Sequence, residues 1–146
     1  MRSILGAAID EEADVTLVDM EAGLEHLSRS GGTLAYADVL LVIMEPSRKS
    51  ILTARRTIVL AEELGLRRVY GVGNKAVLPD DEEFFRSVCA EYSVPLAGII
   101  PVDADVVDAD RRGIPLPEGA GGAVRRAIAE IIAHVDVTMA ETVAPA

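Results

Sequence analysis

The fold of this chain is decided by residues 15–23, which read Val-Thr-Leu-Val-Asp-Met-Glu-Ala-Gly. The first four residues are mostly apolar and mostly β-branched, which is typical of a strand buried on both faces of a parallel sheet. Asp19 then follows at the carboxyl end of this strand, the edge at which open α/β sheets bind ligands. A carboxylate there can hold a metal-bound water, and Gly23 lets the backbone approach a ligand closely. Aspartate and glycine also occur at ordinary strand-to-helix turns, so the stretch alone leaves both explanations open.

Strands and helices are expected to alternate along the whole chain. A helix over residues 2–12 precedes the strand at 15–19, and further strands are expected at 38–44, 68–74 and 96–101. Helices are expected where apolar residues repeat at helical spacing, namely Ile51, Ala54, Ile58 and Ala61, then Phe85, Val88, Cys89 and Tyr92, then Val124, Ile128, Ile131 and Val135. This alternation predicts an α/β fold with a mostly parallel sheet of about four strands and helices on both faces.

The helix boundaries follow from capping residues. Ser47 or Ser50 is expected to begin the helix that Gly65 ends. Asp80 with Glu83 has the spacing of a capping box, and Asp103 is expected to cap a short helix that stops at Gly113. We expect one domain over residues 1–136 and a flexible tail over 137–146.

Composition limits the classes of function. The formal net charge of −10 over 146 residues argues against nucleic acid or an anionic membrane surface as a partner. Cys89 is the only cysteine, so no internal disulfide can form and a reducing compartment is expected. The longest strongly apolar run, residues 39–44, is too short to span a bilayer, and residues 10–12 interrupt any signal-peptide pattern. We therefore expect a cytoplasmic protein.

Residues 19–23 (Asp-Met-Glu-Ala-Gly), followed by Leu-Glu-His-Leu, resemble the switch II segment of MinD-type P-loop ATPases, and the CooC branch above all. Residues 38–54, Gly73-Asn74-Lys75, and 100–103 with 113–115 resemble later segments of that family. The resemblance implies a three-layer P-loop-NTPase-like (Rossmann-like) fold. It also implies a nucleotide-dependent switch of the kind that assists nickel insertion into carbon monoxide dehydrogenase.

The family's phosphate loop, Gly-Lys-Gly-Gly-x-Gly-Lys-[Ser/Thr], does not occur in these 146 residues. We therefore expect a carboxyl-terminal part of such an ATPase that lacks its first strand, which in the resembled fold lies between the strands at 15–19 and 38–44. Phosphoryl transfer depends on the backbone N–H groups and the lysine of this loop. The chain is therefore expected not to hydrolyse ATP by itself.

The resemblance implies ATP or ADP with magnesium as ligand. Asp19 would lie near Mg²⁺ or its water, and Gly23 would contact the terminal phosphate. Asn74 and Lys75 would form the base-reading strand end, with the Asn74 amide at the adenine edge, while Pro101 and Asp103 would shape the base pocket. Turn chemistry and helix capping explain Asn74, Pro101 and Asp103 without any ligand.

No metal site is predicted, because the Cys-x-Cys nickel site of some CooC-type proteins is missing here. A protein partner or a homodimer is expected, with neither nucleic acid nor membrane. Two other classes of function stay open. One is a non-catalytic protein-binding module derived from this fold, and the other is a receiver-like domain with Asp19 as phosphoacceptor and Lys75 as its lysine.

Overall fold

The computed structural model describes residues 15–20, 37–77 and 79–143 of the chain. Its elements are β1 (Leu40–Met44), α4 (Arg48–Glu63), β2 (Val69–Ala76), α5 (Asp80–Glu91), β3 (Leu96–Pro101), α6 (Ala104–Arg112) and α7 (Gly122–Val143). The strands lie in the order β1-β2-β3, and both neighbouring pairs are parallel. The predicted α/β fold with a parallel sheet is therefore confirmed, with three strands in the described part.

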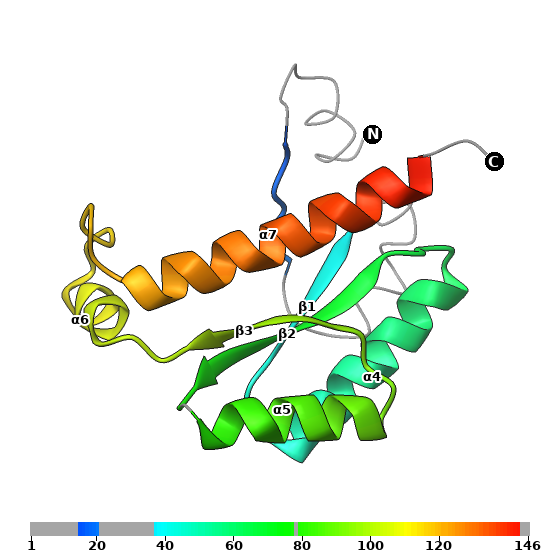
Figure 1. Ribbon diagram of the computed structural model, residues 1–146, viewed down its shortest axis with the longest axis horizontal. Coiled ribbons are helices and arrows are strands. Elements are labelled where there is room, and N and C mark those ends of the chain that lie inside the picture. Colours follow the sequence, from blue (N-terminus) through cyan, green and yellow to red (C-terminus); the bar gives the residue numbers. More distant parts are fainter. Residues whose placement is uncertain (1–14, 21–36, 78, 144–146) are drawn as a thin grey trace.

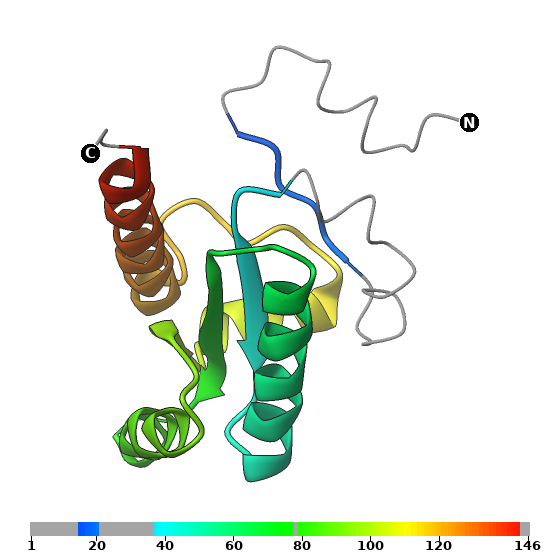
Figure 2. The ribbon, with the colours of Figure 1, turned by 90° about the vertical axis from the view of Figure 1, so that its right-hand side faces the viewer.

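The elements form three layers around the sheet. Figure 1 shows α7 crossing one face of the sheet, with α4 and α5 on the opposite face, and the turned view in Figure 2 agrees. We call these the α7 face and the α4/α5 face. α7 packs mainly against β3, and α4 packs against β1 and β2. Helices thus cover both faces, as expected of a parallel sheet.

Local sequence explains the ends of α4. The Ser47 hydroxyl accepts a hydrogen bond from the Ser50 N–H, which satisfies one of the free donors of the first turn. At the other end Gly65 adopts a φ of 95°, and the Leu66 N–H donates to the Ala61 carbonyl at 3.0 Å. A Schellman ending of this kind needs a left-handed residue, which glycine supplies without strain.

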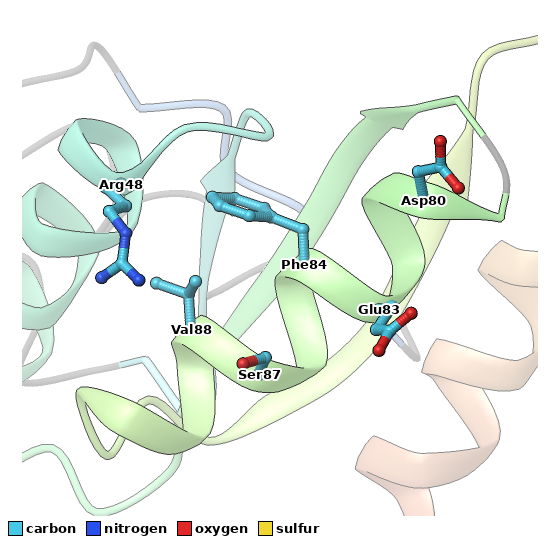
Figure 3. A pocket seen from close by; sticks show the side chains of 6 residues that line it. All are labelled: Arg48, Asp80, Glu83, Phe84, Ser87 and Val88. Carbon is cyan, nitrogen blue, oxygen red and sulfur yellow. The ribbon is translucent and has the colours of Figure 1, made fainter.

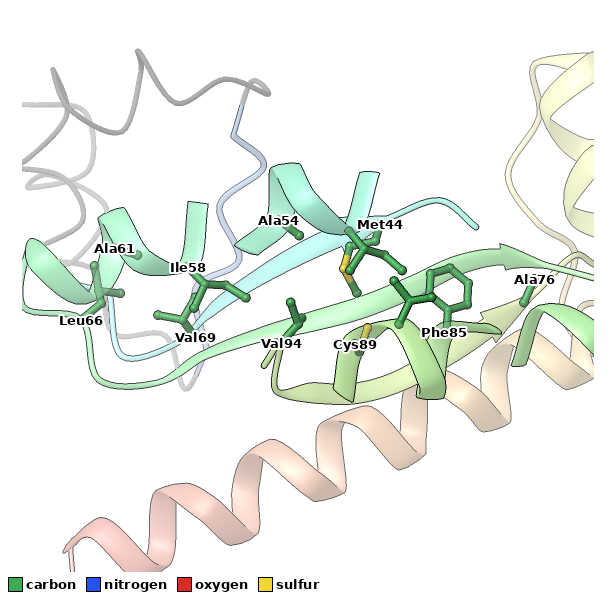
Figure 4. Close-up of a cluster of buried hydrophobic side chains, with 12 residues drawn as sticks. Met44, Ala54, Ile58, Ala61, Leu66, Val69, Ala76, Phe85, Cys89 and Val94 are labelled. Atoms are coloured by element: carbon green, nitrogen blue, oxygen red, sulfur yellow. The ribbon is translucent and has the colours of Figure 1, made fainter. Parts of the chain in front are cut away.

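The core lies between the sheet and the pair α4 and α5. Ile51 and Ile58 from α4 meet Met44 from β1 and Phe85 from α5, and each of these side chains is fully buried (Figure 4). Gly73 of β2 lies close to this ring, because a Cβ atom at its position would lie 3.0 Å from the Phe85 side chain, which would have to shift to make room. Aromatic and branched side chains from the two helices therefore fill the space that the missing side chain of Gly73 leaves above β2.

The expected buried strand over residues 15–19 is wrong. Residues 15–20 form no strand, and Val15 and Leu17 are 83% and 91% exposed. Met20, in contrast, packs against the core. An apolar run becomes a strand only where a neighbouring strand offers hydrogen bonds, and none in the described sheet pairs with it. The expected helix over 2–12 lies outside the described residues.

Two boundary predictions also differ from the structure. Pro79 precedes α5 and makes no capping bond through a side chain, so the expected capping box of Asp80 and Glu83 is absent. The Asp81 carboxylate instead accepts a hydrogen bond from the Val77 N–H at 2.7 Å. The helix α7 continues to Val143, which is past the boundary at residue 136 that was expected before the flexible tail.

Candidate functional site

The carboxyl ends of the three strands lie along one edge of the sheet. Ala76 of β2 pairs with Pro101 of β3, and the Val102 N–H donates to the Ala76 carbonyl at 2.8 Å. Parallel strands place their carboxyl ends together. The structure therefore brings together four of the predicted site residues at this edge, namely Asn74, Lys75, Pro101 and Asp103.

Asn74 and Lys75 lie near the end of β2 in an unusual backbone conformation. Lys75 has a φ of 58°. This value lies in the left-handed region, which residues other than glycine, asparagine and aspartate rarely adopt. The Asn74 Oδ1 atom accepts a hydrogen bond from the Lys75 N–H at 2.9 Å. This bond leaves the Nδ2 group of the half-buried Asn74 without a partner in the described part of the chain.

An ion pair crosses the edge from β2 to β1. Lys75 Nζ lies 2.7 Å from Glu45 Oε1, and both side chains are more than half exposed. The hydrogen bond to Lys75 and its positive charge lower the pKa of Glu45, and the same contacts raise the pKa of Lys75. Sequence reasoning missed Glu45. The signal that could have found it is an acidic residue directly after one parallel strand and a lysine near the end of the next.

Asp103 begins α6, as predicted. Its Oδ1 atom accepts a hydrogen bond from the Asp105 N–H at 2.9 Å, and Gly113 ends the helix with a φ of 61°. Asp105 in turn accepts from the Gly121 N–H at 3.0 Å, which ties α6 to the loop before α7. The Asp103 side chain is thus partly occupied by capping and is half-buried at the edge of the sheet.

The two predicted phosphate-side residues are Asp19 and Gly23. Asp19 is exposed and does not end a strand. Gly23 lies outside the described residues.

A hollow of about 400 Å³ lies between the start of α4 and α5. Arg48, Asp80, Glu83, Phe84, Ser87 and Val88 line it (Figure 3). The Arg48 guanidinium already donates to both Glu91 carboxylate oxygens at 2.9 Å and to the Tyr92 hydroxyl at 3.2 Å. None of the predicted nucleotide residues lines this hollow.

Among the described residues no group of three or more histidine, cysteine, aspartate or glutamate side chains could hold a metal ion. No helix in the described ranges is long and apolar enough to cross a membrane.

Comparisons with known proteins agree with this geometry. The solved structure of the MinD cell division protein of Aquifex aeolicus superposes with a TM-score of 0.57 at 23% identity, over 78% of this chain and 49% of that one. The same organism's MinC:MinD complex matches with a TM-score of 0.50 at 25% identity. No protein-family model matches the chain. The architecture is thus that of a MinD-type α/β protein with a parallel sheet.

Proteins of similar sequence indicate the family more closely than the solved structures do. An uncharacterised ATP-binding protein of Methanocaldococcus jannaschii is 32% identical over 117 residues, which are 80% of this chain and 44% of that protein. The carbon monoxide dehydrogenase accessory protein CooC of Rhodospirillum rubrum is 32% identical over 114 residues, 78% of this chain and 42% of that protein. The chain is thus related to MinD/CooC-type proteins over most of its own length, and it spans less than half the length of these relatives.

Proposed function

We propose that this chain is the base-binding part of a MinD/CooC-like nucleotide-dependent switch ATPase. The observation that carries the proposal is the convergence of Asn74, Pro101 and Asp103 at the carboxyl edge of β2 and β3. Relatives that are named ATP-binding proteins match most of the chain, including these strands. The same resemblance supports ATP or ADP, with magnesium, as the ligand.

Asn74 is the group best suited to read the base. It is the only asparagine in the chain, and no glutamine occurs, so no other side-chain amide is available. Because its Oδ1 atom already accepts from the Lys75 N–H, the free Nδ2 group is oriented as a donor. An adenine ring offers nitrogen acceptors to such a donor. Lys75, held by Glu45, and the ring of Pro101 would border the same pocket.

The described residues do not supply a phosphate loop. Asp19, near magnesium or its water, and Gly23, at the terminal phosphate, keep the roles that the family resemblance gives them. The 146 residues contain no phosphate loop, and its backbone N–H groups and lysine supply the electrostatic stabilisation of phosphoryl transfer. We therefore propose that the chain binds the base weakly and does not hydrolyse ATP alone.

The client of the switch is a finer proposal. The relationship to the carbon monoxide dehydrogenase accessory protein supports a role in metallocentre maturation, such as nickel insertion. The nucleotide switch, and not a metal site on the described residues, would then be the contribution of this chain. The likeness to a MinD structure solved with MinC supports a protein partner or a dimer as the target of the switch.

Calorimetric titration of the purified chain with Mg-ATP and Mg-ADP tests the proposal. We expect binding, and we expect Asn74→Asp to weaken it about tenfold or more, since this loses a hydrogen bond to the base and adds a negative charge. Aspartate keeps an oxygen that can accept from the Lys75 N–H, so the strand end stays intact. Arg126→Gln, on the exposed side of α7, is the control for a change of net charge.

The second candidate function is a non-catalytic protein-binding module. It predicts no heat of nucleotide binding in the wild-type chain and no difference between the two variants. Hydrolysis of ATP by the purified chain that disappears in Asp19→Asn would contradict the proposed lack of turnover.

A further inference from the structure

The helix α7 has an exposed apolar stripe beside its buried side. Ala127 and Ile131 are buried, and α7 packs mainly against β3. Ile128 and Ile132, each one residue further along the helix, are 41% and 54% exposed. Figure 1 shows α7 on its own face of the sheet, with α4 and α5 on the opposite face. Two isoleucines one turn apart are therefore left uncovered by the described helices.

The contact between His134 and Tyr70 shows which way this stripe faces. The two rings meet edge to face with their centroids 5.6 Å apart, and Tyr70 lies on β2. On a helix with 3.6 residues per turn, His134 lies to one side of the buried Ile131, and Ile128 and Ile132 lie to the other. The two isoleucines therefore face away from β2, on the β3 side of the molecule.

Charged residues of opposite sign stand at the two ends of this stripe. Arg125 comes three residues before Ile128, and Asp136 comes four residues after Ile132. Residues with these spacings lie on one side of a helix. Ala129 belongs to the same side, is exposed, and is small enough for another helix to approach closely. The stripe therefore has an apolar centre, a cation toward the start of α7 and an anion further along.

Both charged groups can take a further partner. The Arg125 guanidinium donates through Nε to the Ala120 carbonyl and through Nη2 to the Pro117 carbonyl, so its Nη1 group is still available. These two bonds also hold the arginine at the start of α7. Asp136 is exposed, and no described residue pairs with its carboxylate.

The stripe is complementary to a second copy of itself in the antiparallel direction. The midpoint between Ile128 and Ile132 is at position 130, and the midpoint between Arg125 and Asp136 is half a residue further on. At a rise of 1.5 Å per residue, these midpoints differ by less than about 1 Å along the helix. A two-fold axis there places Ile128 opposite Ile132 of the second copy, and Arg125 opposite its Asp136. A parallel pair would instead bring like charges together.

We propose that α7 docks against α7 of a second copy of this chain as an antiparallel pair, with the two isoleucines of each copy at its centre. A two-fold pair is the commonest arrangement of identical chains, because one surface serves both copies. The stripe is short, so the contact belongs with small, transient interfaces, and we expect a Kd of about 10–100 μM. The inference goes beyond the proposed nucleotide switch and is tested without nucleotide, so its failure would leave that proposal standing.

Sedimentation equilibrium of the full chain measures this association. We expect a monomer–dimer equilibrium, and Ile132→Lys should weaken it about tenfold or more, because each copy then brings a charge into the apolar centre. Leu52→Lys is the matched control, since Leu52 is also a partly exposed apolar residue but lies on α4, on the other face of the sheet. It should leave the association unchanged. A chain that stays monomeric up to about 1 mM, or equal effects of the two variants, would overturn the inference.

Oxidative cross-linking tests the direction of the pair. In a Cys89→Ala background, Ala129→Cys should give a disulfide between two copies, because position 129 lies next to the two-fold axis. Asp136→Cys should not, since the antiparallel arrangement separates the two copies of this position by about 17 Å along the helices. A disulfide that forms as readily from Asp136→Cys as from Ala129→Cys, or none from Ala129→Cys, would overturn the antiparallel pair.

Discussion

Lys75 combines a strained backbone with an exposed side chain. Its φ of 58° lies in the left-handed region, where glycine is preferred. A residue with a Cβ atom adopts this conformation at a cost of about 1–2 kcal/mol. The structure holds this conformation through the Asn74 side chain on one side and the Glu45 ion pair on the other. Strain of this type is often found at binding sites, which agrees with a functional role for the end of β2.

Two substitutions at this position separate the backbone from the charge. Lys75→Gly and Lys75→Ala both remove the ammonium group, and only glycine relieves the positive φ. We expect the glycine variant to be more stable than the alanine variant by about 1 kcal/mol, measured by urea denaturation. An alanine variant as stable as the glycine variant would show that Lys75 does not hold this conformation in solution.

The Glu45–Lys75 pair gives the site a defined pH window. The pKa of Glu45 is lowered, so its contribution to stability is present above the ordinary carboxyl pKa of 4.5 and is lost as the pH falls through the folded value. The pKa of Lys75 is raised, so its contribution is present below the ordinary value of 10.5 and is lost as the pH rises through the folded value. The pair is therefore complete between these limits.

NMR titration of the Glu45 carboxyl carbon measures this interaction directly. In Lys75→Met the pKa of Glu45 should return toward its ordinary value, because both the hydrogen bond and the positive charge are gone. Lys49→Met, a cation on the first turn of α4 with an exposed side chain, is the control and should leave the pKa of Glu45 where it is. Identical titrations in wild type and Lys75→Met would refute the pair.

The helix α7 shows that packing decides which apolar residues of a helical stripe become buried. The expected stripe of the last helix included Ile128, yet Ile128 is 41% exposed and Ala127 is buried in its place. Close approach of α7 to β3 explains this difference. A Cβ atom at Gly98 would collide with the Ile131 side chain, so the helix lies with Ile131 directly above the glycine.

Truncation of the two isoleucines tests this orientation of α7. Ile131→Ala should lower the free energy of unfolding by about 2–5 kcal/mol, because it opens a cavity over Gly98. Ile128→Ala truncates another isoleucine of α7, three residues earlier, and should lower the free energy of unfolding by less than about 1 kcal/mol. Chemical denaturation of both variants measures the difference. Equal losses would mean that α7 is rotated relative to the orientation described.

The contrast between α4 and residues 15–19 shows which elements the sequence could predict. The buried stripe of α4, from Ile51 to Ala61, was predicted correctly, and its cap, Ser47, is one of the two serines that the sequence allowed, because both features depend on residues close in the chain. The strand at 15–19 was not, because a strand depends on a partner that local sequence does not contain. The edge position of Asn74 and Pro101 was predictable from parallel topology, whereas the φ of Lys75 and its bond to Glu45 were not.

At the scale of the whole molecule, one core joins the elements between β1 and β3. The cluster between the sheet and α4 and α5 takes residues from β1, α4, β2 and α5, so opening one of these elements exposes side chains of the others. Cys89 lies inside this cluster at 2% exposure, and burial raises the pKa of its thiol. As the only cysteine, it is a probe of how cooperatively the molecule opens.

Maleimide labelling of Cys89 should therefore require opening of the core. We expect the native chain to label at least about a thousandfold more slowly than the urea-unfolded chain, since even a marginally stable domain opens rarely. The combined variant Cys89→Ala with Ser87→Cys moves the thiol to an exposed position on α5 and should label rapidly. If both thiols reacted at similar rates, the three-stranded sheet with its helices would not be a stable unit by itself.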